Sequence, residues 1–376
     1  MKTNNMGSKM MAVLVCSGAV CLAGSAGAAV INVTTSNFAN KMNEVSSGDT
    51  VNFANGTYTF TSTLFSKLAK ANVKIIGESK SGVQFYSNVS NIDERFFFDS
   101  KNGVQIEKVT FFNTSVRFKD SSNFVVKNCK FDNNKNLASS SIPEKICRAS
   151  GGSGGTFENL QAVHNSPSWF ANNWKAFVMV GHSDGKITDT TSEGKLAGGI
   201  GIGSTTGGNM TGNTSERYSG GPENGRLECD HGIYVNTHTG FTVNGNTMTG
   251  WPDKACGQGL KLKEVEDGVA RYNHFYTSGL IVRSASTANA IKNVYMQSNT
   301  CHAGDLSFWL VGKKAVAVRV KSCAVKNGII TLTDGDYSQF NNTVGAAGNL
   351  AGGFYGCSAT GFTAPSNVIN NNFTEL

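Results

Sequence analysis

Three short segments in the middle of the chain share one pattern of alternating apolar and polar positions. They run from His231 to Asn236, from Gln258 to Lys263 and from Ser278 to Arg283. In each segment two apolar residues alternate with residues of other kinds, as expected of a strand whose inner face is buried. The segments recur at spacings of roughly 20 to 30 residues, the range of solenoid coils. We therefore predict an all-β solenoid in which each coil adds a strand to a shared sheet.

Stacking these strands in register predicts two columns of outward-facing side chains. The first column is expected to contain Met179, Gly201, Tyr234, Lys261 and Ile281, and the second Gly181, Gly203, Asn236, Lys263 and Arg283. The columns place basic and aromatic side chains together on one flat face. Gly201 and Gly203 leave a gap beside them, where we expect a polymer to lie against the backbone. The alternative is that Gly-Ile-Gly only eases a tight coil.

Composition favours one long solenoid over several globular domains. The 376 residues include 44 glycines, 5 prolines and only 16% charged residues, which is typical of many short strands joined by turns. Residues 30–376 are predicted to form a single domain. Recurrent asparagines are expected to stack as a structural ladder, namely Asn128, Asn213, Asn246, Asn273, Asn299 and Asn370. Two stretches break the rhythm, 136–156 and 205–227, and we expect them to wall a cleft.

The N-terminus has the pattern of a bacterial secretory signal. Lys2 and Lys9 precede an apolar run from Met10 to Leu22, and small residues lead to Ala29. We predict that residues 1–29 are a signal peptide and that the protein is secreted or periplasmic. A membrane anchor is the weaker alternative, because the apolar run is shorter than the roughly 20 residues that span a bilayer.

The charge of the chain favours an anionic partner. The formal net charge is +7, and removal of the signal peptide takes away two lysines. A modest basic excess on an exported protein suits an acidic polymer, although a soluble surface would account for it equally. Nucleic acid is disfavoured because the basic residues are dispersed and the protein is predicted to be exported.

Seven cysteines lie beyond the predicted signal peptide. Cys229 and Cys256 hold matching positions two residues before His231 and Gln258, so we expect a disulfide between neighbouring coils. By the same matching of positions on neighbouring coils, we expect a disulfide between Cys301 and Cys323. Cys129 and Cys147 form a third expected pair on weaker grounds, and Cys357 has no expected partner. No Cys-x-x-Cys pair occurs, which disfavours a zinc site.

The basic and aromatic face could act on a uronic acid polymer. A cation neutralises the carboxylate and acidifies the C5 proton, a base removes that proton, and an acid protonates the departing O4. Crowded cations lower a lysine pKa, so Lys261 is the predicted base. Tyr234 is the predicted acid, with Arg283 and Lys263 as carboxylate clamps. The alternative for each lysine is a solvated surface charge.

His231 and Asp230 are adjacent and offer a second proton carrier. A neighbouring carboxylate can orient an imidazole as a base or as a neutraliser of the substrate carboxylate. A buried histidine bonded to a turn is the structural alternative. Asn236, Gly201, Gly203 and Asp230 are the remaining predicted substrate contacts, beside Lys263.

A short helix at the mature N-terminus completes the pattern. Phe38, Met42 and Val45 fall on one side of it, Ser36 is its predicted N-cap, and Gly-Asp-Thr-Val and Gly-Thr-Tyr follow. With this capping helix and the segment 229–283, the chain resembles the single-stranded right-handed parallel β-helix polysaccharide lyases. That group includes pectate lyases, the chondroitinase B type and several alginate lyases.

The resemblance implies a lysine base with an arginine or tyrosine acid from a nearby coil, matched here by Lys261 with Arg283 or Tyr234. It makes alginate the leading substrate. Many such enzymes bind calcium through carboxylates, for which Asp253, Glu264 and Glu266 are candidates without a recognisable motif. We expect no required cofactor and leave calcium open.

Other activities fit the same fold. A glycoside hydrolase needs two carboxylates, which Glu228, Asp230 and Asp253 could supply. A C5 epimerase shares the proton abstraction, and a non-catalytic glycan-binding surface would need none of this chemistry. The chain is predicted to be a secreted lyase that cleaves an acidic polysaccharide by β-elimination.

Overall fold

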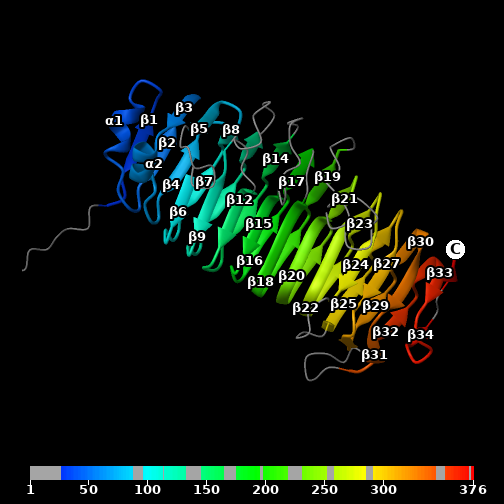
Figure 1. Ribbon diagram of the computed structural model, residues 1–376. Helices are drawn as coiled ribbons and strands as arrows, with labels where there is room; N and C mark the ends of the chain where they lie inside the picture. Colours follow the sequence, from blue (N-terminus) through cyan, green and yellow to red (C-terminus); the bar gives the residue numbers. More distant parts are fainter. Residues whose placement is uncertain are drawn as a thin grey trace, which may run out of the picture.

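The computed structural model describes residues 27–87, 96–112, 114–132, 145–164, 175–194, 198–218, 231–251, 258–284, 291–343, 352–371 and 374–376. These residues form an elongated stack of coils with parallel pairing between strands of successive coils (Figure 1). The predicted all-β, parallel β-helix architecture is confirmed. The predicted signal peptide falls almost wholly outside the described residues and stays a prediction. Within the described residues, none of the helices has the length and apolar character needed to cross a bilayer.

Each coil contributes strands to three rows, here called A, B and C. Row A contains β6 (Phe96–Asp99), β9 (Val116–Lys119), β12 (Lys145–Ser150), β15 (Lys175–Val180), β24 (Leu280–Arg283) and β27 (Leu306–Trp309). Row B contains β1 (Val30–Val33), β2 (Thr50–Phe53), β4 (Lys74–Gly77), β7 (Gln105–Glu107), β10 (Val125–Lys127), β13 (Thr156–Glu158), β16 (Gly185–Thr188), β25 (Ile291–Gln297), β28 (Lys314–Val316), β29 (Arg319–Lys321), β31 (Asp336–Gln339), β32 (Gly353–Tyr355) and β34 (Asn370–Asn371). Row C contains β3 (Gly56–Phe60), β5 (Val83–Ser87), β8 (Thr110–Phe112), β11 (Lys130–Asp132), β14 (Gln161–His164), β17 (Thr191–Gly194), β19 (Thr214–Arg217), β21 (Thr247–Thr249), β23 (His274–Phe275), β26 (Thr300–Cys301), β33 (Ser358–Thr363) and β35 (Thr374–Glu375).

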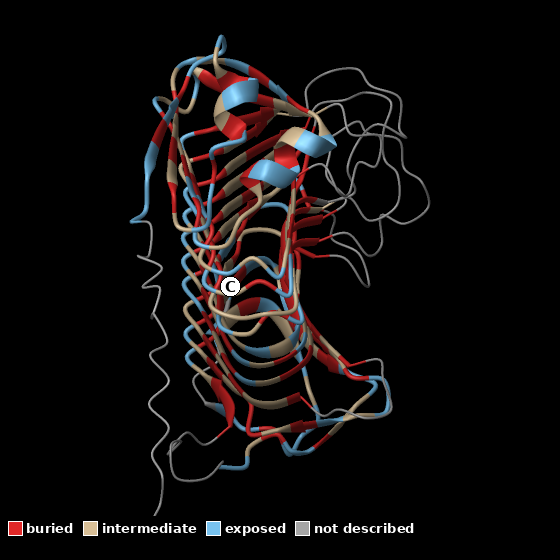
Figure 2. Cartoon of the chain, turned by 90° about the vertical axis from the view of Figure 1, so that its left-hand side faces the viewer, coloured by how far each residue is buried: buried red, intermediate tan, exposed pale blue. Residues whose placement is uncertain are grey.

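Four long strands pass from one row to the next. They are β18 (Gly198–Thr211), β20 (His231–Asn244) and β22 (Leu260–Arg271), which run from row A into row B, and β30 (Ala324–Thr333), which runs from row C into row A. Because the rows follow one another around every coil, inward side chains from all three meet in one continuous core. Figure 2 shows the buried residues in red along the coils. Phenylalanines stack along this core from coil to coil, as Phe98 does on Phe118 with ring centroids 5.0 Å apart.

Two short helices lie at the N-terminal end of the stack (Figure 1). Helix α1 (Phe38–Met42) buries its first and last residues, and α2 (Ser62–Leu68) follows the first row C strand. Phe38 packs edge-on against Phe60, with ring centroids 4.9 Å apart. The residue before α1 is Asn37 and makes no side-chain capping bond, so the prediction of Ser36 as N-cap was wrong. A capping role for α1 stays a prediction.

A ladder of buried asparagines runs along the turn from row B to row C. In each coil a residue with positive φ comes first and the ladder residue follows it, as in Gly212 and Asn213. The Asn213 side-chain amide donates to Asn246 Oδ1 at 2.9 Å, and the same bond repeats from Asn246 to Asn273 and from Asn273 to Asn299. The ladder predicted for these four residues is confirmed. Asn128 was wrongly included because it holds the positive-φ position, and Asn370 was wrongly included because it lies in row B.

The cysteines do not pair as predicted. Cys129, Cys147, Cys301 and Cys323 are buried free thiols, so the predicted bonds 301–323 and 129–147 are wrong. Cys323 instead continues the asparagine ladder and accepts from the Asn299 side chain at 3.8 Å, whereas Cys301 lies two positions further along its coil. Cys229 and Cys256 lie outside the described residues.

Replacing one ladder asparagine should destabilise the protein strongly. Asn246→Ala leaves the buried Asn213 amide and the Met210 carbonyl without the bonds that Asn246 makes to them. We expect a loss of about 2–4 kcal/mol in the free energy of unfolding, measured by urea denaturation. Asn52→Ala is the matched control, because Asn52 lies on the outer face and bonds only to Asn32 at 3.3 Å through its side-chain amide. Equal losses in the two variants would contradict the structural role of the ladder.

Candidate active site

The two predicted columns lie on the outer face of row A, but the residues predicted for strand β15 were wrong. Gly201, Tyr234, Lys261 and Ile281 are register neighbours on successive strands. Gly203, Asn236, Lys263 and Arg283 form the second column. On β15, however, the neighbours of the two glycines are Val178 and Val180. Met179 points into the core and is fully buried, and Gly181 follows the strand, so both were misplaced by one residue.

Lys261 lies at the centre of a group of cations. Only 5% of the residue is exposed, although it belongs to an outward column. Burial, and after it the charges of Arg283, Lys263 and Lys175 in that order, lower the pKa of its ammonium to about 7. Both effects disfavour the charged amine. Lys261 is therefore able to exchange a proton near neutral pH.

Tyr234 lies directly beside Lys261 on the neighbouring coil. The Lys261 Nζ lies 5.5 Å from the centroid of the phenol ring. Burial, and after it the negative charge of Glu264, raise the pKa of this phenol to about 12, while the charge of Arg283 opposes the rise. The phenol thus keeps its proton at neutral pH, where part of Lys261 has lost its own.

Lys175 approaches the same ring and was not predicted. Its Nζ lies 5.4 Å from the Tyr234 ring centroid, although Lys175 comes from β15, two strands away. The side chain reaches that far because Gly198 lies between the two strands. A Cβ at Gly198 would approach the Lys175 Cγ to 2.8 Å. Gly198 therefore makes room for a lysine stem.

Packing alone also accounts for the glycines at positions 201 and 203. A Cβ at Gly203 would come within 2.9 Å of the Asn236 carbonyl oxygen, and a Cβ at Gly201 within 3.3 Å of the Tyr234 carbonyl oxygen. Close approach of the next strand is therefore sufficient to favour glycine at both positions. Their contact with a polymer stays a prediction.

Lys263 and Asn236 lie at the turn that ends the row A part of each strand. Lys263 Nζ is 3.9 Å from Glu264 Oε1, and Glu264 is itself buried. The other carboxylate oxygen of Glu264 accepts a hydrogen bond of 3.2 Å from the Thr237 hydroxyl. The sequence analysis named this acid as a calcium candidate but did not predict its contact with Lys263, whose charge it partly neutralises.

Arg283 is held by an aromatic ring. Its guanidinium carbon lies 4.2 Å from the centroid of Trp309, its register neighbour on β27. The Trp309 indole N–H donates to Asp334 Oδ2 at 3.0 Å. Arg283 Nε is buried and has no hydrogen-bond partner among the described residues. Among the described residues no carboxylate forms an ion pair with Arg283, so its positive charge faces the site uncompensated.

His231 lies beside the candidate acid. Its ring centroid is 4.3 Å from that of Tyr234, and only 7% of the residue is exposed. Asp230, its predicted partner, lies outside the described residues. Two other histidines have structural bonds: His182 binds the backbone of Gly151 and Gly155, and His238 binds the Gly207 carbonyl.

The described acids do not form a calcium site. Glu264 is bonded to Thr237 and adjacent to Lys263, Glu266 forms an ion pair with Lys292, and Asp253 lies outside the described residues. Across the described ranges no three His, Cys, Asp or Glu side chains come close enough to hold a metal ion. The residues described do not fit the calcium sites that the resemblance implied, and we derive no chemical step through a metal.

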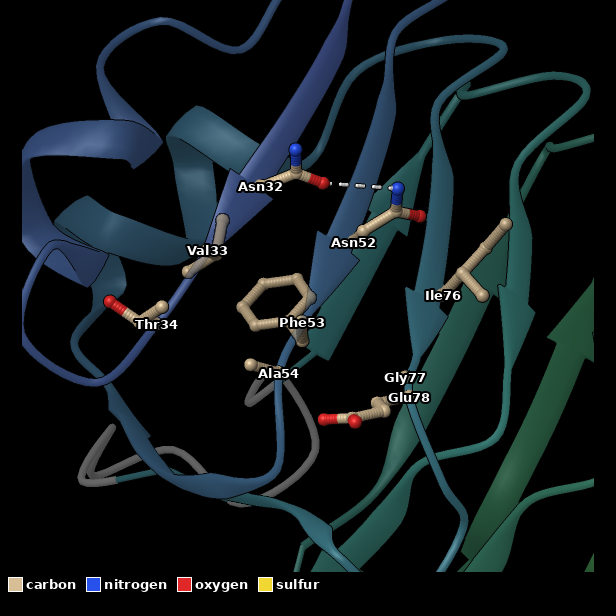
Figure 3. A pocket seen from close by; sticks show the side chains of 9 residues that line it. All are labelled: Asn32, Val33, Thr34, Asn52, Phe53, Ala54, Ile76, Gly77 and Glu78. Carbon is tan, nitrogen blue, oxygen red and sulfur yellow. Dashed lines mark hydrogen bonds between the residues drawn. The ribbon is translucent and has the colours of Figure 1, made fainter.

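A well-formed hollow lies elsewhere. Figure 3 shows a pocket of about 410 Å³ at the N-terminal end of row B, several coils away from Lys261. Its lining residues are Asn32, Val33, Thr34, Asn52, Phe53, Ala54, Ile76, Gly77 and Glu78. The acid there, Glu78, accepts the backbone N–H of Asn55 at 2.9 Å. We find no cluster of proton carriers in this pocket.

Comparison with solved structures supports the fold. A family PL6 alginate lyase aligns with 92% of this chain and 53% of its own, at 11% identity and a TM-score of 0.50. A mannuronic acid specific family 6 lyase from human gut microbiota covers 93% and 91%, at 12% identity and 0.49. A polygalacturonase from Erwinia carotovora covers 93% and 96%, at 11% identity and 0.43. The chain spans about half the length of the first of these. At such identities the likeness concerns the fold alone.

No protein-family profile and no curated protein sequence matches the chain. The site therefore has to be interpreted from its own residues.

Removing the buried charge at Lys261 should stabilise the protein in a pH-dependent way. The folded-state pKa of about 7 lies below the ordinary value of 10.5, so the native state binds fewer protons than the unfolded state between these values. Wild-type stability should consequently rise with pH from about 7 to 10.5. Relative to wild type, Lys261→Met should gain about 1–3 kcal/mol below pH 7, and the gain should shrink towards pH 10.5.

Urea denaturation at pH 6 and at pH 10 measures this difference. Lys186→Met is the control, since Lys186 is exposed on row B. If the two variants have the same pH dependence, Lys261 has no depressed pKa.

Proposed function

We propose that this protein is a polysaccharide lyase that cleaves a uronate-containing polymer by β-elimination. The observation that carries the proposal is the pairing of Lys261 and Tyr234. One has a pKa lowered to about 7 and the other a pKa raised to about 12, with the lysine Nζ 5.5 Å from the phenol ring. Two proton carriers with separated pKa values are what a base and an acid in one site require.

In the proposed reaction the neutral Lys261 amine removes the C5 proton of a uronate. The electron pair of that C–H bond forms the C4–C5 double bond, and the C4–O4 bond breaks. The Tyr234 phenol gives its proton to the departing O4. The products are one chain with an unsaturated uronate at its new non-reducing end and a second chain with a new reducing end. The enzyme regains its starting state when Lys261 loses the proton and Tyr234 recovers one.

The cations around Lys261 suit the carboxylate of the substrate. Neutralising that carboxylate acidifies the C5 proton, and a dry site strengthens the effect. Arg283 is the better clamp, because Lys263 shares its charge with Glu264. Lys175, which was not predicted, adds a further cation beside Tyr234.

We propose alginate as the substrate and export as the route to it. The support is the fold shared with an alginate lyase and the secretion-like N-terminus. We propose that the polymer is anionic because the described site combines Lys175, Lys261, Lys263 and Arg283 with one buried acid. The acids considered for a hydrolase, Glu228, Asp230 and Asp253, lie outside the described residues.

An absorbance assay tests the activity. Purified protein incubated with alginate, pectate, hyaluronan and chondroitin sulfate should produce ultraviolet absorbance from the new double bond with at least one polymer. Lys261→Met should lower kcat at least 1000-fold by removing the base, whereas Lys186→Met should retain wild-type activity. New reducing ends without absorbance would indicate a hydrolase, and neither signal would favour an epimerase or a binding surface.

The pH profile tests the assignment of the base. Because Lys261 acts as a neutral amine, kcat/KM should rise with pH and level off above about 7. Arg283→Gln removes the charge that lowers this pKa most, so the midpoint should move to higher pH while the plateau falls. A profile that keeps its midpoint in Arg283→Gln would assign the base to another group.

A further inference from the structure

On the coils that follow Arg283 in the stack, Trp309 and its partner Asp334 form a second group of residues beside the site. Trp309 and Asp334 take no part in the proton transfers proposed above, but Trp309 contacts Arg283 of the site and Asp334 contacts Trp309. Arg283 stacks on Trp309 at 4.2 Å, and Trp309 bonds to Asp334 at 3.0 Å. The three residues come from consecutive coils, because β24 pairs with β27 and β27 with β30, whose last residue immediately precedes Asp334.

The kind of contact matters because Arg283 has two tasks. As a clamp it must keep its hydrogen-bond donors available for a carboxylate, and as a neighbour of Lys261 it must keep its positive charge uncompensated. A carboxylate partner would hold the guanidinium but would occupy its donors and offset its charge. An indole face attracts the cation without carrying a negative charge.

The position of Asp334 follows the same logic. Asp334 is exposed, so water screens its charge. Asp334 accepts a hydrogen bond from the indole N–H of Trp309, and the indole ring lies between Asp334 and the Arg283 guanidinium. The indole is thereby fixed by a charge-assisted hydrogen bond while the acid does not itself contact Arg283.

We propose that Trp309, held by Asp334, is a positioning residue that keeps Arg283 next to Lys261 and free to bind the substrate carboxylate. This inference rests on the proposed function for its consequence in catalysis. Its consequence for the pKa of Lys261 does not depend on the proposed function and can be measured on the folded protein without substrate. If Arg283 is released into solvent, its effect on Lys261 weakens and the pKa of Lys261 rises.

The charged and titratable groups that face Lys261 come from several strands. They are Arg283 on β24, Lys263 and Glu264 on β22, Lys175 on β15, and Tyr234 and His231 on β20. Arg283 is the member of this group that Trp309 contacts in the described part of the chain, so a shift in the Lys261 pKa in a Trp309 variant reports on Arg283.

The test measures the Lys261 pKa without requiring activity. The rate at which an amine-reactive acylating reagent modifies Lys261 is followed against pH by peptide mass spectrometry. Trp309→Leu should move the midpoint upward by about 0.5 pH unit or more. Trp309→Phe keeps an aromatic face and should restore most of the wild-type value.

The structure offers a matched control on another row. Arg319 stacks on Tyr355 at 5.0 Å on the outer face of row B, away from Lys261. Tyr355→Leu removes the same kind of contact and should leave the Lys261 midpoint unchanged. Asp334→Ala keeps the indole but removes its hydrogen-bond acceptor, and it should shift the midpoint in the same direction as Trp309→Leu. This variant provides the test if Trp309→Leu does not fold.

On a polymer that the protein cleaves, Trp309→Leu should raise KM at least tenfold and move the kcat/KM profile to higher pH, whereas Tyr355→Leu should change neither. An unchanged or lower midpoint in both Trp309→Leu and Asp334→Ala would overturn the inference. If no polymer is cleaved, the proposed function fails, but the acylation midpoint still decides whether Trp309 positions Arg283.

Discussion

In-register parallel stacking is the constraint on which the whole structure depends. Each residue faces its counterpart on the next coil at about 4.8 Å, so every position becomes a column. Inside the stack a column is stable when identical side chains on successive coils can contact one another favourably. Phenylalanines do so through ring contacts, and asparagines do so because each amide carries both a donor and an acceptor. The ladder from Asn213 to Asn299 repeats one bond for this reason, and a thiol at Cys323 continues it with a weaker contact.

On the outer face the same constraint forces charges together. Lys261, Lys263 and Arg283 lie on adjacent strands, where repetition of positive charge is unfavourable. An ordinary surface would relieve this with acids, as Asp99 does for Lys119 at 3.4 Å. Around Lys261 the relief is incomplete, because Glu264 lies nearer to Lys263 and Trp309 takes the place of an acid beside Arg283. The repeated positive charge then adds to the larger effect of burial in lowering the Lys261 pKa.

Alternation and spacing were sufficient to predict the columns from Gly201 to Arg283, because most outward positions of those strands are polar, charged or glycine while the inward ones are apolar. The prediction slipped by one residue at Met179, where the strand 177–180 is apolar at every position and alternation gives no phase. The cysteine pairing failed because sequence matching ignored the positive-φ residue that marks each turn. Lys175 and Trp309 were missed because their contacts depend on long side chains that reach across coils, which no local pattern encodes.

The separation of the two pKa values has a single origin. Removal from water disfavours the charged form of any group, which lowers the pKa of an amine and raises that of a phenol. Burial of Lys261 and Tyr234 in one place therefore yields an unprotonated base and a protonated acid together, between pH 7 and pH 12. Neighbouring charges only adjust this window: Arg283 lowers both values, and Glu264 raises that of Tyr234. A site that excludes water while keeping its cations can thus provide both proton carriers without a metal-bound water or a separate histidine.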